Sequence, residues 1–136
     1  IDATTGLFVV PNGTGTTPNS LKLDWVSGAF KWITGAVTYT TGAGQGCSFE
    51  NVTADESVGE AAKLHLQALA LLKYDATAGA YDGDYLYADP TQAERSFFCG
   101  GHWSSGAYSG VFFASGNIPR SSVFTIIGFR SAFVQL

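Results

Sequence analysis

The sequence predicts an α+β domain in which antiparallel strands and one main helix are joined by long loops. Residues 21–41 alternate apolar and polar side chains and are rich in β-branched and aromatic residues, which is typical of strands. Residues 54–74 repeat apolar side chains at helical spacing. The 17 glycines and the 14% aromatic share indicate an aromatic core connected by many tight turns.

Size and charge limit the classes of function. At 136 residues the chain suits one domain, residues 1–136. Its formal net charge of −4 and its lack of a basic cluster argue against binding to nucleic acid or anionic membranes. No apolar run approaches the roughly 20 residues of a membrane helix, so we expect no membrane insertion. Because the chain starts at Ile1 and contains no Met, we expect a mature fragment, a processed precursor or the distal domain of a longer protein.

The first third of the chain predicts short strands and loops. The apolar residues 7–10 favour a strand, and residues 13–20 favour a loop or a linker to a longer protein. Two or three strands follow, with turns at Ser27-Gly28 and near Gly35. We interpret residues 42–46 (GAGQG) as a surface loop, because no Lys-Ser/Thr follows them as in a phosphate-binding loop.

The predicted helix covers about residues 54–74. Thr53 and Glu56 have the spacing of a capping box. Apolar residues cover so wide an arc that we expect the helix to pack on two sides: Val58, Ala61, Ala62, Leu64, Leu66, Leu69, Leu71 and Leu72. His65 lies within this arc, and we interpret it as a hydrogen-bonded core or edge histidine before a ligand.

Residues 74–90 predict a turn-rich aromatic loop centred on Asp82-Gly83-Asp84. The two carboxylates fit either a solvated turn or a structural Ca²⁺ near Asp82 and Asp84. The further oxygen ligands of an EF-hand are missing, so the solvated turn is the first interpretation. No cofactor is otherwise expected.

The two cysteines, Cys47 and Cys99, leave three alternatives open. They could be two buried free thiols, one disulfide or, least favoured, a catalytic thiol. Their spacing is not that of a metal site.

The last third of the chain has a composition suited to contact with another molecule. Residues 96–99 predict a buried strand, and residues 111–114, 123–127 and 129–134 predict the remaining strands. From Ser96 to the end there is no Asp, Glu or Lys. Ser and Gly predominate between the strands, together with Tyr108 and Asn117, and Tyr, Ser, Gly and Asn give adaptable contacts in binding loops.

Two short motifs bracket this stretch. Gly-Gly-x-Trp opens it and Gly-Phe-Arg closes it; the matching positions are Gly100, Gly101, Trp103, Gly110, Gly128 and Arg130. This pattern resembles the C-type-lectin-like fold in its formylglycine-generating-enzyme-like branch. Within that branch it is most similar to the major tropism determinant family, which comprises phage receptor-binding proteins diversified by retroelements. The resemblance implies a C-type-lectin-like α+β fold with a scaffold formed by these six residues.

The resemblance also implies a receptor-binding surface between the two motifs. Residues near positions that vary in the family are His102, Ser104, Ala107, Tyr108, Asn117, Ser121 and Val123. The complete expected surface adds Ser105, Ser109, Ile118, Arg120, Ser122 and Thr125. Residues 104–129 contain no Lys, Glu, Gln, Met or Trp, which is compatible with diversification through adenine mutation.

By this resemblance the chain is expected to belong to a phage tail or fibre tip on the virion. Its partner would be a host surface protein or glycan, and family members often form homotrimers. The alternatives are a non-diversified adhesive or structural lectin-like domain of a bacterial or phage surface protein, or an ordinary core sheet with turns.

An enzymatic function is not expected. The chain lacks a Gly-x-Ser-x-Gly nucleophile elbow, and neither cysteine lies in a formylglycine-generating motif. The Glu-Pro-Asn, Gln-Pro-Asp and Trp-Asn-Asp tripeptides of calcium-dependent lectins are also absent. Glycan binding would therefore depend on Tyr108, tryptophan and backbone groups without a metal.

Overall fold

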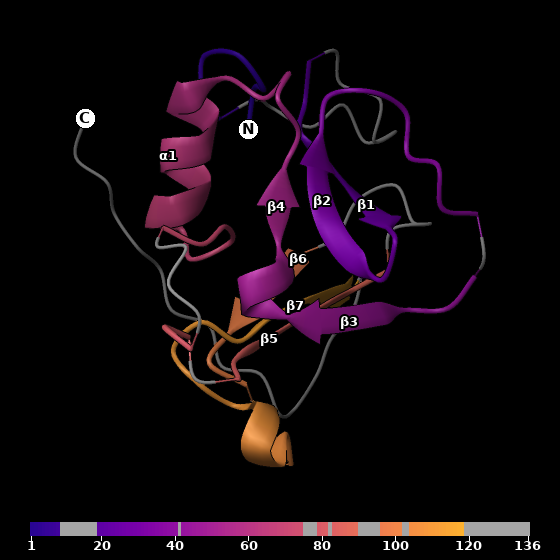
Figure 1. Cartoon of the computed structure of the whole chain (residues 1–136), viewed down its shortest axis with the longest axis vertical. Helices are drawn as coiled ribbons and strands as arrows, with labels where there is room; N and C mark the ends of the chain where they lie inside the picture. The colour runs from indigo at the N-terminus through magenta and orange to yellow at the C-terminus, as the bar shows by residue number, and fades with distance from the viewer. Residues whose placement is uncertain are drawn as a thin grey trace.

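The structure, a computed structural model, describes residues 1–8, 19–40, 42–74, 79–81, 83–89, 96–101 and 104–118. Within these residues the chain forms two small β-sheets, one α-helix and two short 3-10 helices (Figure 1). This arrangement confirms the predicted α+β class.

The first sheet contains the hairpin that the sequence predicts. Strand β1 (Lys22–Val26) pairs antiparallel with β2 (Ala29–Ile33), and β2 pairs parallel with the short β4 (Thr53–Ala54). Ser27 and Gly28 connect β1 and β2 and both have positive φ, 53° and 87°. Two successive positive φ angles are typical of the type I′ turn, whose twist matches that of the paired strands.

Asp24 of β1 holds residues 36–40 in an irregular loop, so the third strand expected after Gly35 does not form. Its carboxylate is 2% exposed and accepts hydrogen bonds from the N–H groups of Trp25, Thr38 and Tyr39 and from the Thr38 hydroxyl, at 2.7–3.1 Å. Burial alone would raise the pKa of Asp24, but these hydrogen bonds lower it below its usual value. The side chain therefore replaces the ladder that a third strand would have made.

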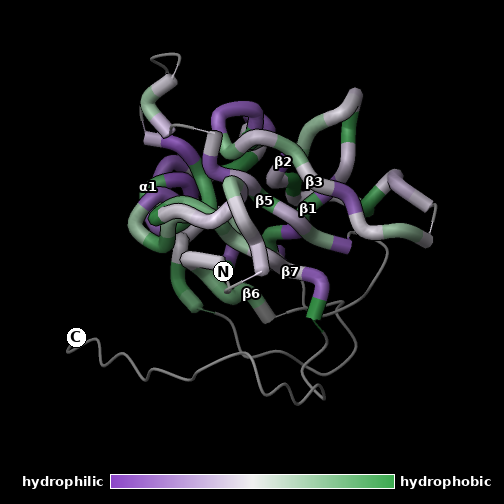
Figure 2. Tube along the Cα trace, turned by 90° about the horizontal axis from the view of Figure 1, so that it is seen from below, coloured by the Kyte–Doolittle hydropathy of each residue, from purple (hydrophilic) through white to green (hydrophobic). Residues whose placement is uncertain are grey.

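The second sheet has the strand order β3-β5-β7-β6, and Figure 2 shows the strands following one another in this order. Strand β3 (Gln45–Ser48) pairs antiparallel with β5 (Tyr85–Ala88), β5 pairs parallel with β7 (Ala114–Ile118), and β7 pairs antiparallel with β6 (Ser96–Cys99). Strand β6 confirms the predicted strand at residues 96–99. Phe97 and Phe98 are half-buried and Cys99 is exposed, so the expectation of a buried strand is wrong.

Three other strand predictions are corrected. Residues 7 and 8 form no strand, and their side chains are exposed because no neighbouring strand lies beside them in the described residues. Residues 85–88 form β5 although we expected a loop. Residues 111–112 form a turn closed by the Phe113 N–H to Gly110 carbonyl hydrogen bond, so β7 begins at the end of the predicted strand. The predicted strands at 123–127 and 129–134 lie outside the described residues.

Helix α1 (Glu60–Ala68) is shorter than predicted, and its N-terminus lies at Gly59. The expected capping box is wrong because Thr53 pairs with Lys31 of β2. The Asp55 carboxylate binds the N–H and hydroxyl of Ser57 and forms an ion pair with Lys31 at 2.9 Å. The pKa of Asp55 is strongly lowered by its bond with Lys31 and by the bonds with Ser57. Strand pairing and local side-chain bonds thus override helix propensity here.

The helix ends at a Schellman motif. Ala70 adopts a positive φ of 54°, its N–H donates to the Gln67 carbonyl, and the Leu71 N–H donates to the Leu66 carbonyl. Leu71 and Leu72 therefore reach the core after the helix has ended. Their helical spacing in the sequence does not reflect a helical position.

Helix α1 packs on one side, not on two as predicted. Ala62 and Leu66 are buried, whereas Leu64 is 61% exposed. His65 behaves as expected for a hydrogen-bonded edge residue: its Nδ1 lies at the Gly6 carbonyl and its ring contacts Phe8 edge to face.

The core joins both sheets and α1. Its central cluster comprises Phe30, Trp32, Cys47, Phe49, Val52, Leu66, Leu71, Leu72, Tyr81, Leu86, Ala88 and Ala114. Phe49 opens the 3-10 helix η1 (Phe49–Asn51). The buried Trp32 indole N–H donates to the Leu71 carbonyl at 2.8 Å, which links β2 to the segment after α1.

Candidate binding surface

The candidate site centres on residues 104–111, called here the contact loop. It contains the 3-10 helix η2 (Gly106–Tyr108), the short orange helix that projects at the bottom of Figure 1. Tyr108 is 59% exposed and Val111 is 80% exposed. The other predicted site residues of the loop are also accessible: Ser104, Ala107 and Ser109 are exposed, and Ser105 is half-buried.

Two glycine-containing contacts hold the start of the loop. The Gly100 N–H donates to the Phe113 carbonyl at 3.0 Å, which joins the two ends of the loop. Gly101 has a φ of +78°, and a Cβ atom at this position would lie 2.6 Å from the Ser109 hydroxyl oxygen. A larger residue at Gly101 would be strained and would displace Ser109. Gly100 and Gly101 therefore lie at the base of the contact loop.

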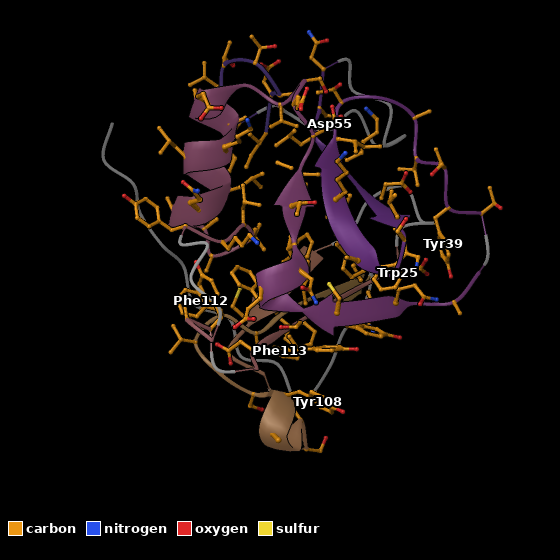
Figure 3. The ribbon with its side chains drawn as sticks, viewed as in Figure 1. Trp25, Tyr39, Asp55, Tyr108, Phe112 and Phe113 are labelled. Carbon is orange, nitrogen blue, oxygen red and sulfur yellow. The ribbon has the colours of Figure 1, made fainter. Side chains whose placement is uncertain are left out.

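Phe112 anchors the end of the loop in an aromatic cluster. Its ring centroid lies 5.5 Å from that of Phe49 and 4.9 Å from that of Tyr81. Its N–H donates to the Asp84 carboxylate at 2.7 Å. Gly110 lies so close to the same carboxylate that a Cβ atom would collide with it. In Figure 3, Phe112 and Phe113 lie between the loop and the rest of the domain.

Asp84 thus supports the contact loop. Its Oδ2 accepts the Phe112 N–H, and its own backbone bonds to Tyr81 and Phe49. Asp82, the other acid of the suggested calcium turn, lies outside the described residues. Among the residues that are described, no group of three or more His, Cys, Asp or Glu side chains could hold a metal ion.

Two tyrosines that the sequence did not predict lie beside the contact loop. Tyr85 and Tyr87 alternate along β5 with the buried Leu86 and Ala88, so both point to the outer face of the second sheet. The rings of Tyr85 and Tyr108 lie 5.1 Å apart. Burial, then the neighbouring Cys47, Tyr108 and Tyr87, raise the pKa of Tyr85. The period-two pattern Tyr-Leu-Tyr-Ala was the signal that could have identified them.

The structure separates Asn117 and Ile118 from the contact loop. Both lie at the far end of β7, about 10 Å along the strand from Ala114. Ser115 is the register partner of Tyr87, and Asn117 lies two residues further on, so Asn117 shares the outer face with the tyrosines. Its side-chain oxygen accepts a hydrogen bond from the Ser115 hydroxyl at 2.9 Å.

The remaining predicted residues lie outside the described part of the chain. They are His102, Arg120, Ser121, Ser122, Val123 and Thr125 of the expected surface and Trp103, Gly128 and Arg130 of the expected scaffold.

Both cysteines are free thiols, so the disulfide alternative is wrong. The expectation of two buried thiols is correct for Cys47 and wrong for Cys99, which is exposed. Burial raises the pKa of the Cys47 thiol, although a backbone hydrogen bond from Phe30 opposes the effect, and partial desolvation by the surrounding chain also raises the pKa of the Cys99 thiol. A raised pKa disfavours the thiolate form that a nucleophile requires.

No protein-family model matches the chain, and no curated protein matches its sequence. In the part of the chain that the structure describes, no helix has the length and apolar character needed to cross a bilayer. The function must therefore be argued from the chain's own residues.

Proposed function

We propose that this chain is a C-type-lectin-like receptor-binding domain of a phage tail or fibre tip. It attaches the virion to a host-cell surface receptor through the contact loop and the adjoining outer face of the second sheet. The proposed fold and function rest on the resemblance of the Gly-Gly-x-Trp and Gly-Phe-Arg motifs to those of the phage receptor-binding family. The contact loop lies between these two motifs.

The observation that carries this proposal is the contrast between the anchors of the contact loop and its exposed residues. The anchors are Gly101, Gly110 and Phe112, which contact Ser109, Asp84 and the aromatic core. Between them lie the exposed Ser104, Ala107 and Tyr108. Recognition loops on rigid scaffolds combine fixed ends with Tyr, Ser and Gly at the contact surface. Such a loop can vary in sequence without loss of the fold.

The charge of the loop favours the same function. Residues 104–111 include no charged side chain, and the whole chain has a formal net charge of −4. A nucleic-acid partner would require a basic surface. We propose a homotrimer at the virion, because three copies convert a weak single-site affinity into firm attachment.

Binding to bacterial cells tests the proposal. The labelled chain is coupled to a multivalent carrier and applied to a panel of bacteria, with Tyr108→Ala as the test variant. Tyr74→Ala is the matched control, because Tyr74 is 83% exposed and its side chain is remote in sequence from the loop. We expect Tyr108→Ala to reduce binding at least about tenfold without a change in thermal unfolding.

Tyr74→Ala should bind as the parent does. Binding to none of the bacteria, or equal binding by the parent and Tyr108→Ala, would contradict the proposal. Asn117→Ala provides a second test of the outer face and should also weaken binding while the fold remains intact.

A further inference from the structure

The six tyrosines of the chain fall into distinct groups by the use of their hydroxyls. The Tyr81 hydroxyl accepts the Tyr74 N–H, and the Tyr39 hydroxyl accepts a hydrogen bond from Gln45. Within the described residues, the hydroxyls of the other four tyrosines take part in no hydrogen bond: Tyr74, Tyr85, Tyr87 and Tyr108. Tyr85, Tyr87 and Tyr108 lie together at the outer face of the second sheet, and we call these three residues the tyrosine row. Their hydroxyls are free to bond a ligand.

The rings of Tyr85 and Tyr87 pack against glycines. A Cβ atom at Gly46 would collide with the ring of Tyr85, and one at Gly44 would collide with the ring of Tyr87. The Tyr85 ring therefore covers the backbone of the edge strand β3 at Gly46, and the Tyr87 ring covers the backbone just before that strand at Gly44. Tyr85 and Tyr87 are only half-buried, so each ring keeps an accessible surface.

The three tyrosines follow one another along the outer face, a strip of surface that they share. Tyr85 is central: its ring lies 5.1 Å from that of Tyr108. Residues two apart on a strand face lie about 7 Å apart, which places Tyr87 next along the strip. In Figure 3, Tyr108 lies between η2 and the sheet, at the end of the domain opposite Asp55.

Charge near the row disfavours an anionic ligand. Among the described residues, two acids flank the row in sequence: Asp84, whose carboxylate accepts the Phe112 N–H, and Asp89, which follows β5. The described segments around the three rings, residues 44–48, 83–89 and 104–118, contain no Lys or Arg that would attract an anion. The three rings themselves offer a neutral ligand apolar faces with hydroxyls at their edges.

We propose that the tyrosine row binds a neutral oligosaccharide of the host-cell surface. A sugar ring has an apolar C–H face bordered by hydroxyls, and each tyrosine offers an apolar ring with a hydroxyl at its edge. Successive sugar residues would stack on successive rings without a metal ion. This inference rests on the proposed attachment function, because it names the ligand class for the same surface.

A printed array of neutral and anionic oligosaccharides tests the inference. The chain is presented as a multivalent complex on streptavidin, so that weak single-site binding is detected. We expect binding to a subset of neutral glycans, with at least about tenfold weaker binding for Tyr85→Ala and for Tyr108→Ala. Tyr85→Phe keeps the ring over Gly46 and tests the hydroxyl alone. Tyr74→Ala should bind as the parent does.

Cell binding separates this inference from the proposed function. Bacteria are treated either with periodate, which cleaves sugar diols, or with protease. Loss of binding after periodate alone supports the glycan. Loss after protease alone overturns the inference and retains the attachment function, because the receptor would then be a protein. The inference is also overturned if the parent binds no neutral glycan on the array. It is equally overturned if Tyr85→Ala and Tyr108→Ala are folded and bind as the parent does.

Discussion

Asp24 and Asp84 each use a carboxylate to hold a loop, but the two loops differ in what they present. Asp24 is 2% exposed and accepts four hydrogen bonds, three of them from Thr38 and Tyr39 of residues 36–40. Asp84 is half-buried, and within the described residues its carboxylate accepts one hydrogen bond, from the Phe112 N–H. Beyond the Asp84 anchor stand the exposed Tyr108 and Val111.

The comparison distinguishes support of the fold from support of a surface. The hydrogen bonds of Asp24 hold residues 36–40 beside β1 where no third strand forms, so they stabilise the first sheet. The bond of Asp84 to the Phe112 N–H fixes the end of the contact loop, and Tyr108 and Val111 remain exposed beyond it. Disturbing Asp24 should therefore cost mainly stability, and disturbing Asp84 should cost mainly binding.

The largest expected effect is at Asp24. Asp24→Ala removes a buried acceptor of four hydrogen bonds and should lower the free energy of unfolding by about 3 kcal/mol. Urea unfolding measures this loss. Asp55→Ala is the matched comparison, since Asp55 is a partly exposed acid whose bonds with Lys31 and Ser57 are screened by solvent, so its loss should be smaller. Equal losses for the two variants would contradict the role given to Asp24.

Gly110→Ala should have the next largest effect. Its methyl group would collide with the Asp84 carboxylate, and overpacking of this kind costs about 2 kcal/mol. Gly42→Ala is the control, because a Cβ atom at Gly42 meets no atom within 4 Å. Calorimetry should show a lowered melting temperature for Gly110→Ala alone. If both variants melt as the parent does, the close approach of Gly110 to Asp84 is wrong.

The parent and Asp24→Ala should differ in how their free energy of unfolding depends on pH. The pKa of Asp24 is lowered in the folded chain, so its ionised form stabilises the fold above the unfolded-state pKa of about 3.9. That contribution is lost as the pH falls through the folded pKa. Between pH 6 and pH 2 the parent should therefore lose more unfolding free energy than Asp24→Ala. Parallel pH profiles of the two proteins would exclude this linkage.

Asp84→Asn should have the smallest effect on stability but should weaken binding through the contact loop. The amide keeps an acceptor oxygen but weakens the charge-assisted bond to the Phe112 N–H, at a cost of about 1 kcal/mol. Hydrogen exchange of the Phe112 amide should accelerate, and cell binding should weaken. Unchanged exchange at Phe112 would show that Asp84 does not hold the loop.

Local patterns in the sequence predicted several elements correctly. Alternating residues around Ser27-Gly28 gave the β1–β2 hairpin, because turn and strands favour the same structure. Residues 96–99 were predicted correctly as a strand from their run of aromatic and apolar side chains. The helix was predicted too long, since Thr53 pairs with Lys31 and Ala70 turns the chain out of the helix. The strand pairing of Thr53 depends on a tertiary contact, and the helix end depends on the Schellman motif at Ala70. The spacing of apolar residues predicts neither.

The candidate surface was predicted in part. Ser104, Ala107, Tyr108 and Ser109 are exposed together as expected. Tyr85 and Tyr87 were missed because β5 lies in a stretch rich in Asp, Gly and Ala that reads as a loop. Only sheet pairing, which brings β5 beside β3 and β7, places them next to the contact loop. Such pairing joins residues far apart in the sequence.

The most direct test of the proposed receptor-binding surface is deep sequencing of the coding region across close relatives of its source. The account predicts that substitutions concentrate at residues 102–125, with Ala107 and Tyr108 among the varied positions. Gly100, Gly101, Gly110 and Asp84 should stay fixed, because they hold the contact loop. Substitutions spread uniformly along the chain, with these four positions as variable as the rest, would contradict it.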